Sequence, residues 1–352
     1  MTKKIAAIAL GIACLLLTSG ITAAGPAGSQ SVTPAGSPAP SPTATSAANP
    51  AALPAASPAA ATAAVSGAPQ ATPQPPQTQS TPSPKGLKVF ISVDMEGICG
   101  VVNWDDVTVG GQDYGLFRRL MTQETNAAIE GAVAAGANEI VVRDAHDTGR
   151  NILPDLLRPE ARLLRAWTYG PLSMMEGIDK TFDAAIFIGY HARASTPNAV
   201  LKHTMSTALL DVIINGKKMP EAGINGLMAG YFGVPVVLVS GDQAISAQAK
   251  ELFGDIETVI VKEAIATAAL NLHPAKAQEL IKQKTTAALK RLKDFKPYKL
   301  SSPYTLEVSF ADEAGAQKVS WIPGAVRKDE HTVAFTANDL MDLMKLFRLS
   351  KL

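Results

Sequence analysis

The sequence predicts an α/β fold in which a mostly parallel sheet carries helices on both faces. Five short, continuous apolar runs are typical of strands that are buried on both sides, and helical segments separate them. A further apolar stretch that is broken by Asn215-Gly216 predicts a β-hairpin insertion. Two more strands and a closing helix after about residue 300 predict a smaller C-terminal α+β portion.

The predicted strands are rich in β-branched and aromatic residues, and the predicted helices repeat apolar residues at helical spacing. In chain order the sheet strands are Lys88–Gly97, Glu139–Val142, Ala184–Gly189, Val234–Val239 and Glu257–Val261. The helices among them are Tyr114–Ala135, Ile245–Leu252 and Pro274–Leu292. The hairpin covers Leu209–Met219, and the last elements are the strands Tyr304–Phe310 and His331–Thr336 and a helix from Asn338.

The N-terminal residues predict export from the cytoplasm. Lys3-Lys4 precede the apolar run Ile5–Leu17, and small residues follow as far as Ala24, which is the pattern of a signal peptide over residues 1–24. The run is shorter than the roughly 20 apolar residues of a transmembrane helix. We expect a secreted, periplasmic or cell-surface protein. A lipoprotein anchored through Cys14 and an uncleaved membrane anchor remain as alternatives.

Residues 25–85 predict a disordered linker. They consist almost entirely of Ala, Pro, Ser, Thr, Gly and Gln, with no aromatic side chain. Such a composition buries too little apolar surface to offset the entropy cost of ordering the chain. We interpret this segment as a spacer and place a single folded domain at 86–352, in which the portion from about residue 300 is a candidate subdomain.

Charge and cysteine content exclude several classes of function. The net charge is +1 and charged residues make up 18% of the chain, so no electrostatic feature favours nucleic acid as a partner. Beyond the signal segment we expect no membrane insertion. With Cys14 and Cys99 as the only cysteines, a disulfide framework and a cysteine-rich structural zinc site are both excluded.

The end of the first strand carries two carboxylates. Side chains alternate along a strand, so Ser92, Asp94 and Glu96 should point to one side. Two carboxylates on one face repel each other unless a cation lies between them, and a divalent metal ion would serve. A solvated polar strand end is the alternative that this stretch leaves open.

Histidines follow the next two predicted strands. His146 comes after the second strand, between Ala145 and Asp147, and His191 comes after the third. A lone histidine is more often a packed or surface residue than a ligand, but binding sites in parallel sheets form at the carboxyl ends of the strands. Nitrogen and oxygen ligands in this mixture suit zinc first, with manganese, cobalt and iron as alternatives. Asp144 and Asp147 are candidates to orient a ligand histidine.

Two further residues are ambiguous from local sequence. Glu221 lies where a helix should begin, so capping of that helix explains it as well as metal binding does. His203 lies between the third strand and the hairpin and is uninformative by itself.

Taken together, five segments closely resemble the D-aminopeptidase family of two-zinc peptidases, peptidase family M55. They are Ser92–Ile98, Asp144–His146, Gly189–Pro197, His203–Met205 and Glu221–Asn225. They occur in the family's order, and the resemblance extends from about Leu87 to the C-terminus. The signal segment and linker depart from the family pattern, which leaves location and physiological substrate open.

The resemblance implies both a site and an activity. Its zinc ligands match Asp94, Glu96, His146, His191 and Glu221, with Asp94 as the bridging carboxylate, and its additional catalytic histidine matches His203. It implies two zinc ions per subunit, a homo-oligomer, and removal of the N-terminal residue from short peptides that begin with a D-amino acid such as D-alanine. Hydrolysis of another small amide or ester and a non-catalytic surface binding protein are the alternatives.

Overall fold

The structure is a computed structural model that describes residues 86–351. The predicted signal segment and linker, residues 1–85, lie outside the described residues, and so does Leu352. Among the helices of residues 86–351, none is both long and apolar enough to cross a membrane.

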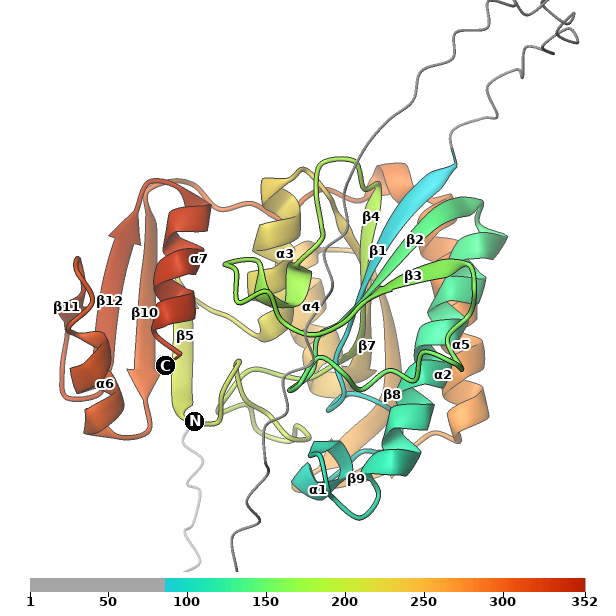
Figure 1. Ribbon diagram of the computed structural model, residues 1–352, viewed down its shortest axis with the longest axis horizontal. Helices are drawn as coiled ribbons and strands as arrows, with labels where there is room; N and C mark the ends of the chain where they lie inside the picture. The colour runs from blue at the N-terminus through green and yellow to red at the C-terminus, as the bar shows by residue number, and fades with distance from the viewer. Residues whose placement is uncertain (1–85, 352) are drawn as a thin grey trace, which may run out of the picture. The chain divides into compact units, whose positions relative to one another are not determined.

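The main sheet has seven strands in the order β3-β2-β1-β4-β7-β8-β9, and every neighbouring pair is parallel except β8 and β9 (Figure 1). The strands are β1 Leu87–Val93, β2 Ala137–Asp144, β3 Ala161–Leu164, β4 Ala184–Tyr190, β7 Val236–Asp242, β8 Glu257–Ile265 and β9 Ala268–Asn271. Strands β2 and β3 follow β1 towards one edge of this sheet. The chain then crosses back and places β4 on the other side of β1. The carboxyl ends of β1 and β4 therefore mark the switch point, where ligands bind in open α/β sheets.

Helices cover both faces of the main sheet, as predicted. On one face Val89 and Ile91 of β1 pack against α2 Tyr114–Ala134 and α5 Pro274–Lys290. On the other, Phe90 belongs to a core shared with α3 Glu221–Tyr231 and α4 Gln243–Phe253. Short turns complete this half: α1 Trp104–Val107, η1 Ser173–Met175 and η2 Leu292–Asp294.

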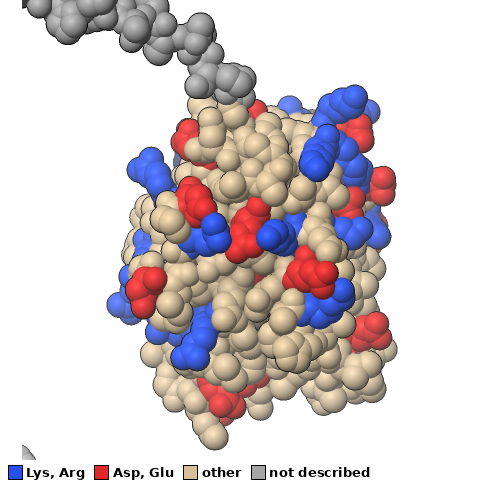
Figure 2. Space-filling view, turned by 90° about the vertical axis from the view of Figure 1, so that its right-hand side faces the viewer, with Lys and Arg blue, Asp and Glu red and all other residues tan. Residues whose placement is uncertain are grey.

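Positive and negative side chains alternate over the outer surface of α2 and α5 (Figure 2). Lys282 of α5 forms a 2.9 Å ion pair with Glu130 of α2, and Glu130 also accepts from Arg158 at 2.9 Å. These pairs lie partly in solvent, so each contributes little to stability. The packing of the two helices depends on the apolar residues beneath them.

The predicted hairpin and the C-terminal portion form one second sheet. Its order is β11-β12-β10-β5-β6, and it is antiparallel throughout. The strands are β5 Leu209–Ile214, β6 Lys217–Lys218, β10 Tyr304–Phe310, β11 Val326–Arg327 and β12 Thr332–Ala337. Helix α6 Glu313–Val319 packs on this sheet, and α7 Leu340–Leu349 lies on the side that faces α3 (Figure 1). The prediction separated these parts because hydrogen bonds between β5 and β10, about ninety residues apart, leave no local pattern.

The hairpin turn confirms its sequence signal. Asn215 and Gly216 both adopt positive φ, 48° and 76°, as the tight turn between twisted strands requires. Several other elements escaped prediction because they are short or lie at sheet edges: α1, β3, β9, α6 and β11.

The first strand ends earlier than predicted. β1 stops at Val93, so Asp94 and Glu96 lie in the turn after it, and strand alternation is the wrong reason for their common direction. Asp94 donates its backbone N–H to Ile188, and Gly97 donates to Gly189, which bends the chain across the end of β4. A Cβ atom on Gly97 would lie 2.0 Å from the Tyr190 carbonyl oxygen, so the turn accepts only glycine there.

Candidate metal centre

Four predicted site residues come together beyond three neighbouring strand ends. Asp94 and Glu96 follow β1, His146 follows β2, and His191 follows β4. All four are at least 93% buried, which is unusual for such polar side chains. The switch point of the sheet therefore carries a buried, ionisable cluster and no solvated strand end.

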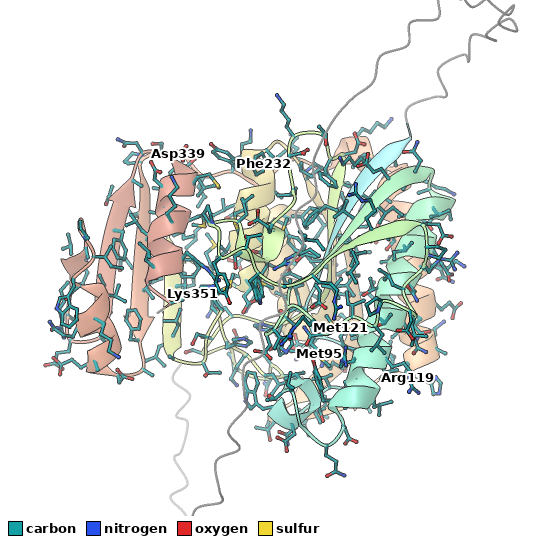
Figure 3. All side chains as sticks on the ribbon, viewed as in Figure 1. Met95, Arg119, Met121, Phe232, Asp339 and Lys351 are labelled. Atoms are coloured by element: carbon teal, nitrogen blue, oxygen red, sulfur yellow. The ribbon has the colours of Figure 1, made fainter. Side chains whose placement is uncertain are left out.

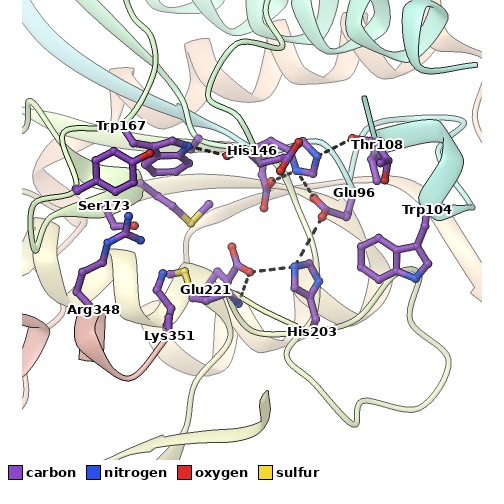
Figure 4. A pocket seen from close by; sticks show the side chains of 17 residues that line it. Glu96, Trp104, Thr108, His146, Trp167, Ser173, His203, Glu221, Arg348 and Lys351 are labelled. Atoms are coloured by element: carbon purple, nitrogen blue, oxygen red, sulfur yellow. Dashed lines mark hydrogen bonds and ion pairs between the residues drawn. The ribbon is translucent and has the colours of Figure 1, made fainter. Parts of the chain in front are cut away.

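The second sheet brings in the other two predicted residues. His203 lies before β5, and Glu221 is the first residue of α3, just after β6. The backbone N–H of Met205 donates to Glu221 Oε1 at 2.6 Å, which ties the His203 loop to the helix. Glu221 does not cap α3 through its side chain, because its carboxylate points into the cluster (Figure 4).

Asp94 lies between two sets of side chains. Its Oδ1 is 3.2 Å from His146 Nδ1, and its Oδ2 is 3.5 Å from His191 Nε2. Glu96 approaches the first histidine at 3.1 Å, and Glu221 approaches the second at 3.2 Å. Two groups that could each hold a cation thus share Asp94: Asp94, Glu96 and His146, and Asp94, His191 and Glu221.

His203 lies beside both sets. Its Nε2 is 3.7 Å from Glu96 Oε1 and 3.5 Å from Glu221 Oε1. Its ring stacks on that of His191, with ring centroids 4.0 Å apart and planes 8° from parallel, and Trp104 meets its edge at 5.3 Å. His203 is the most exposed of the three imidazoles, and its side chain opens towards the cavity.

Backbone carbonyls fix the orientation of all three imidazoles. His146 Nε2 lies 2.9 Å from the Val107 oxygen, His191 Nδ1 lies 3.0 Å from that of Ala192, and His203 Nδ1 lies 2.9 Å from that of Leu201. A ring N–H that donates outward leaves the other nitrogen free to face the cluster, as in metal-binding histidines.

Neither Asp144 nor Asp147 orients His146, contrary to our expectation. Asp144 accepts from the backbone and side chain of Asn151 and from the backbone of Ile152, so it braces the loop after β2. The backbone carbonyl of Val107 orients His146 in place of an aspartate. A sequence pattern cannot reveal this contact, because every residue carries a backbone carbonyl.

Three buried atoms of the cluster have no hydrogen-bond partner among the described residues: Asp94 Oδ2, Glu96 Oε2 and His191 Nε2. Buried polar atoms are normally satisfied, because an unpaired one costs free energy. Two carboxylate oxygens and an imidazole nitrogen that lie close to their neighbours without a well-directed hydrogen bond are the donor set that a borderline metal ion such as zinc prefers.

Burial and neighbouring charges shift the pKa values of the cluster. Burial raises the pKa of Asp94 well above its usual range, and the Glu96 carboxylate raises it further. Burial lowers the pKa of His191, but the carboxylates of Glu221, Glu96 and Asp94 together outweigh burial and raise that pKa to about 10. Burial, with the nearby His191, lowers the pKa of His203. The acidic groups thus favour positive charge at His191, while His203 favours its neutral form.

The cluster forms the floor of a cavity of about 490 Å³. Aromatic side chains line its walls, including Trp104, Trp167 and Tyr169, and Arg348 and Lys351 reach it from the end of α7 (Figure 4). The sequence did not identify these two cations as site residues. The spacing of apolar residues in α7 is that of an ordinary surface helix packed on the second sheet. A cavity of this size accommodates a small ligand.

A buried lysine and a buried glutamate hold the turn that carries Glu96. Lys262 Nζ donates to the carbonyls of Glu96, Ile98 and Val101 at 2.6–2.9 Å. Glu124 Oε1 accepts from the backbone N–H of Cys99 at 2.8 Å. These contacts satisfy backbone groups that the turn leaves without strand or helix partners.

The chain resembles known proteins over nearly all its described length. The model of the M55 peptidase family, described as D-aminopeptidase, matches residues 87–349. The D-aminopeptidase of Bacillus subtilis is 38% identical over 258 residues, which cover 73% of this chain and 93% of that protein. A solved structure, described as the Zn-dependent D-aminopeptidase DppA from Bacillus subtilis, a self-compartmentalizing protease, matches with a TM-score of 0.73 and 36% identity, over 75% of this chain and 97% of that one.

Replacement of Glu124 by glutamine should change how stability depends on pH. Burial raises the pKa of Glu124 from 4.5 to about 7, so the folded state holds this proton more tightly than the unfolded state does. The wild type therefore loses stability as pH rises from about 4.5 through 7, and Glu124→Gln lacks that loss. Urea denaturation should show the variant gaining about 3 kcal/mol on the wild type across this range. A difference that stays constant with pH would contradict this assignment.

Proposed function

The chain belongs to the D-aminopeptidase family, peptidase family M55, and on that premise we propose that it releases the N-terminal residue from short peptides that begin with a D-amino acid, D-alanine in particular. As a member of this family the protein is an enzyme, a metallo-aminopeptidase. The preference for D-residues rests on the family. The choice of D-alanine rests on the family as well.

One observation supports a two-metal site most directly: the two oxygens of Asp94 face two different histidines. We propose that Asp94, Glu96 and His146 would hold one zinc ion, and that Asp94, His191 and Glu221 would hold a second. The unpaired buried oxygens and nitrogen of these side chains fit that assignment. Zinc is favoured by the mixed nitrogen and oxygen donors and by the Zn-dependent relative.

Bound metals would supply a nucleophilic water near neutral pH and polarise the scissile carbonyl. His203 would move the proton. Its Nδ1 faces the Leu201 carbonyl, so Nε2 is free to accept the proton that the attacking water loses. The same nitrogen then returns that proton to the nitrogen of the leaving amine. The lowered pKa of His203 suits this task, since the ring must begin neutral.

We propose that the protein acts outside the cytoplasm, because residues 1–24 have the pattern of a cleaved signal and residues 25–85 that of a spacer. Mass spectrometry of the protein from culture medium or periplasm should find an N-terminus near Gly25. Full-length protein in the cytoplasm would contradict export. We also propose a homo-oligomer, since the Bacillus relative is described as self-compartmentalizing, and light scattering of the purified protein measures this.

The decisive test of the proposed function is hydrolysis of D-Ala-p-nitroanilide by the zinc-loaded protein. We expect release of p-nitroaniline that a chelator abolishes and that added zinc restores. The L-Ala isomer serves as the matched control and should be cleaved far more slowly. Equal rates on both isomers would refute D-selectivity, and activity that resists the chelator would refute the metal assignment.

Two substitutions separate metal binding from proton transfer. His203→Ala should keep two zinc ions per chain but lower kcat about 10²–10⁴-fold, the usual contribution of a general acid–base. Asp94→Ala should lose both metal and activity, because it removes the shared carboxylate. Metal analysis and turnover of both variants check this together. A near-wild-type rate for zinc-loaded His203→Ala would remove His203 from the mechanism, and two retained zinc ions in Asp94→Ala would refute the bridge.

A further inference from the structure

Two cations lie at the same cavity as the buried cluster. Arg348 belongs to the last turn of α7, and Lys351 follows that helix by two residues. Both line the cavity whose floor is formed by Asp94, Glu96 and Glu221. Figure 3 places Lys351 at the end of α7 on the side towards the main sheet, and Figure 4 shows both cations across the pocket from Trp104.

Neither cation has an anionic partner within residues 86–351. No hydrogen bond or ion pair joins Arg348 or Lys351 to a described residue, whereas Lys345 on the same helix pairs with Asp342 at 2.8 Å. The Arg348 guanidinium lies over the rings of Trp167 and Tyr169, 5.9 Å and 5.7 Å from their centroids. These aromatic contacts hold the side chain at the cavity without neutralising its charge.

The two charges also disfavour each other. Burial and the nearby Arg348 together lower the pKa of Lys351 to about 8, although the Glu221 carboxylate across the cavity acts in the opposite direction. A half-buried pair of like charges is costly unless an anion joins it. The loop 166–173, which lines the same cavity, is under backbone strain as well, because Ala166, Tyr169 and Ser173 all adopt positive φ. Strain of this kind persists where the surrounding structure enforces it, and it concentrates at ligand sites.

We propose that Arg348 and Lys351 bind the C-terminal carboxylate of a short peptide whose N-terminal peptide bond lies at the cluster. This inference rests on the proposed function and adds a specificity determinant to it. The guanidinium presents a fork of N–H donors that matches a carboxylate, and the lysine supplies a compact second charge. One cavity of about 490 Å³ contains both ends of the site, which suits a peptide of two or three residues.

This arrangement predicts a preference for short substrates. An extended peptide advances about 3.3–3.6 Å per residue, so only a substrate of the correct length places a carboxylate at the cations while its first peptide bond lies at the cluster. A longer peptide would put an uncharged backbone group there and leave both cations unpaired. Such a substrate forfeits a charge-assisted interaction and is cleaved more slowly.

The test compares D-Ala-D-Ala with its C-terminal amide, which differ only in that carboxylate. In the zinc-loaded wild type we expect kcat/KM to be about 10–100-fold higher for the acid. Arg348→Ala and Lys351→Met should each lower kcat/KM for the acid at least tenfold more than for the amide. Arg348→Gln keeps the stem over the aromatic rings and replaces Arg348→Ala if circular dichroism shows that the alanine variant is unfolded.

Lys345→Ala is the matched control, because it removes a charge from the same helix outside the cavity. It should leave the acid-to-amide ratio unchanged. The inference is overturned if the wild type cleaves both substrates equally, or if the ratio survives both cavity substitutions. A third outcome would show that Arg348 and Lys351 bind free anions and not the peptide carboxylate. In that case inorganic phosphate inhibits the wild type but not the Arg348 variant, while the acid-to-amide ratio of kcat/KM is the same in both. Failure of the zinc-loaded wild type on both substrates would overturn the proposed function as well.

Discussion

The burial of three carboxylates beside three imidazoles is the constraint that shapes this molecule. Asp94, Glu96 and Glu221 would repel one another in a low-dielectric interior unless positive charge lay between them. Imidazolium can supply that charge, as the raised pKa of His191 indicates, and so can a bound metal ion. In this view metal ions replace protons at the histidines, so metal uptake and proton release are linked.

The sequence anticipated the main sheet because its strands are continuous apolar runs and its long helices are strongly periodic. It also anticipated the six cluster residues, since histidines followed two strands and five segments matched one family in order. The structure brings all six together at the switch point. The predicted alternation of side chains along a strand was the wrong reason for the direction of the Asp94 side chain. The backbone hydrogen bond from Asp94 to Ile188, in the turn after β1, sets that direction.

What sequence could not predict depends on contacts between distant segments. The pairing of β5 with β10 joins a hairpin and a C-terminal strand that local periodicity treats as separate elements. The carbonyl of Val107 positions His146 through a backbone atom that any residue would offer. Arg348 lies on an amphipathic helix whose spacing matches an ordinary surface element, and only the assembled cavity distinguishes it from Lys345.

The hairpin of the second sheet has a consequence for the order of folding. No residue of the cluster lies beyond Glu221 in the chain, yet His203 and Glu221 flank a hairpin whose strand β5 is held by β10, about ninety residues later. Contacts that span so much chain form late, because loop closure costs entropy before the contact offsets it. We therefore expect the ends of the first strands to assemble early and the centre to form only when β10, near the end of the chain, has paired with β5.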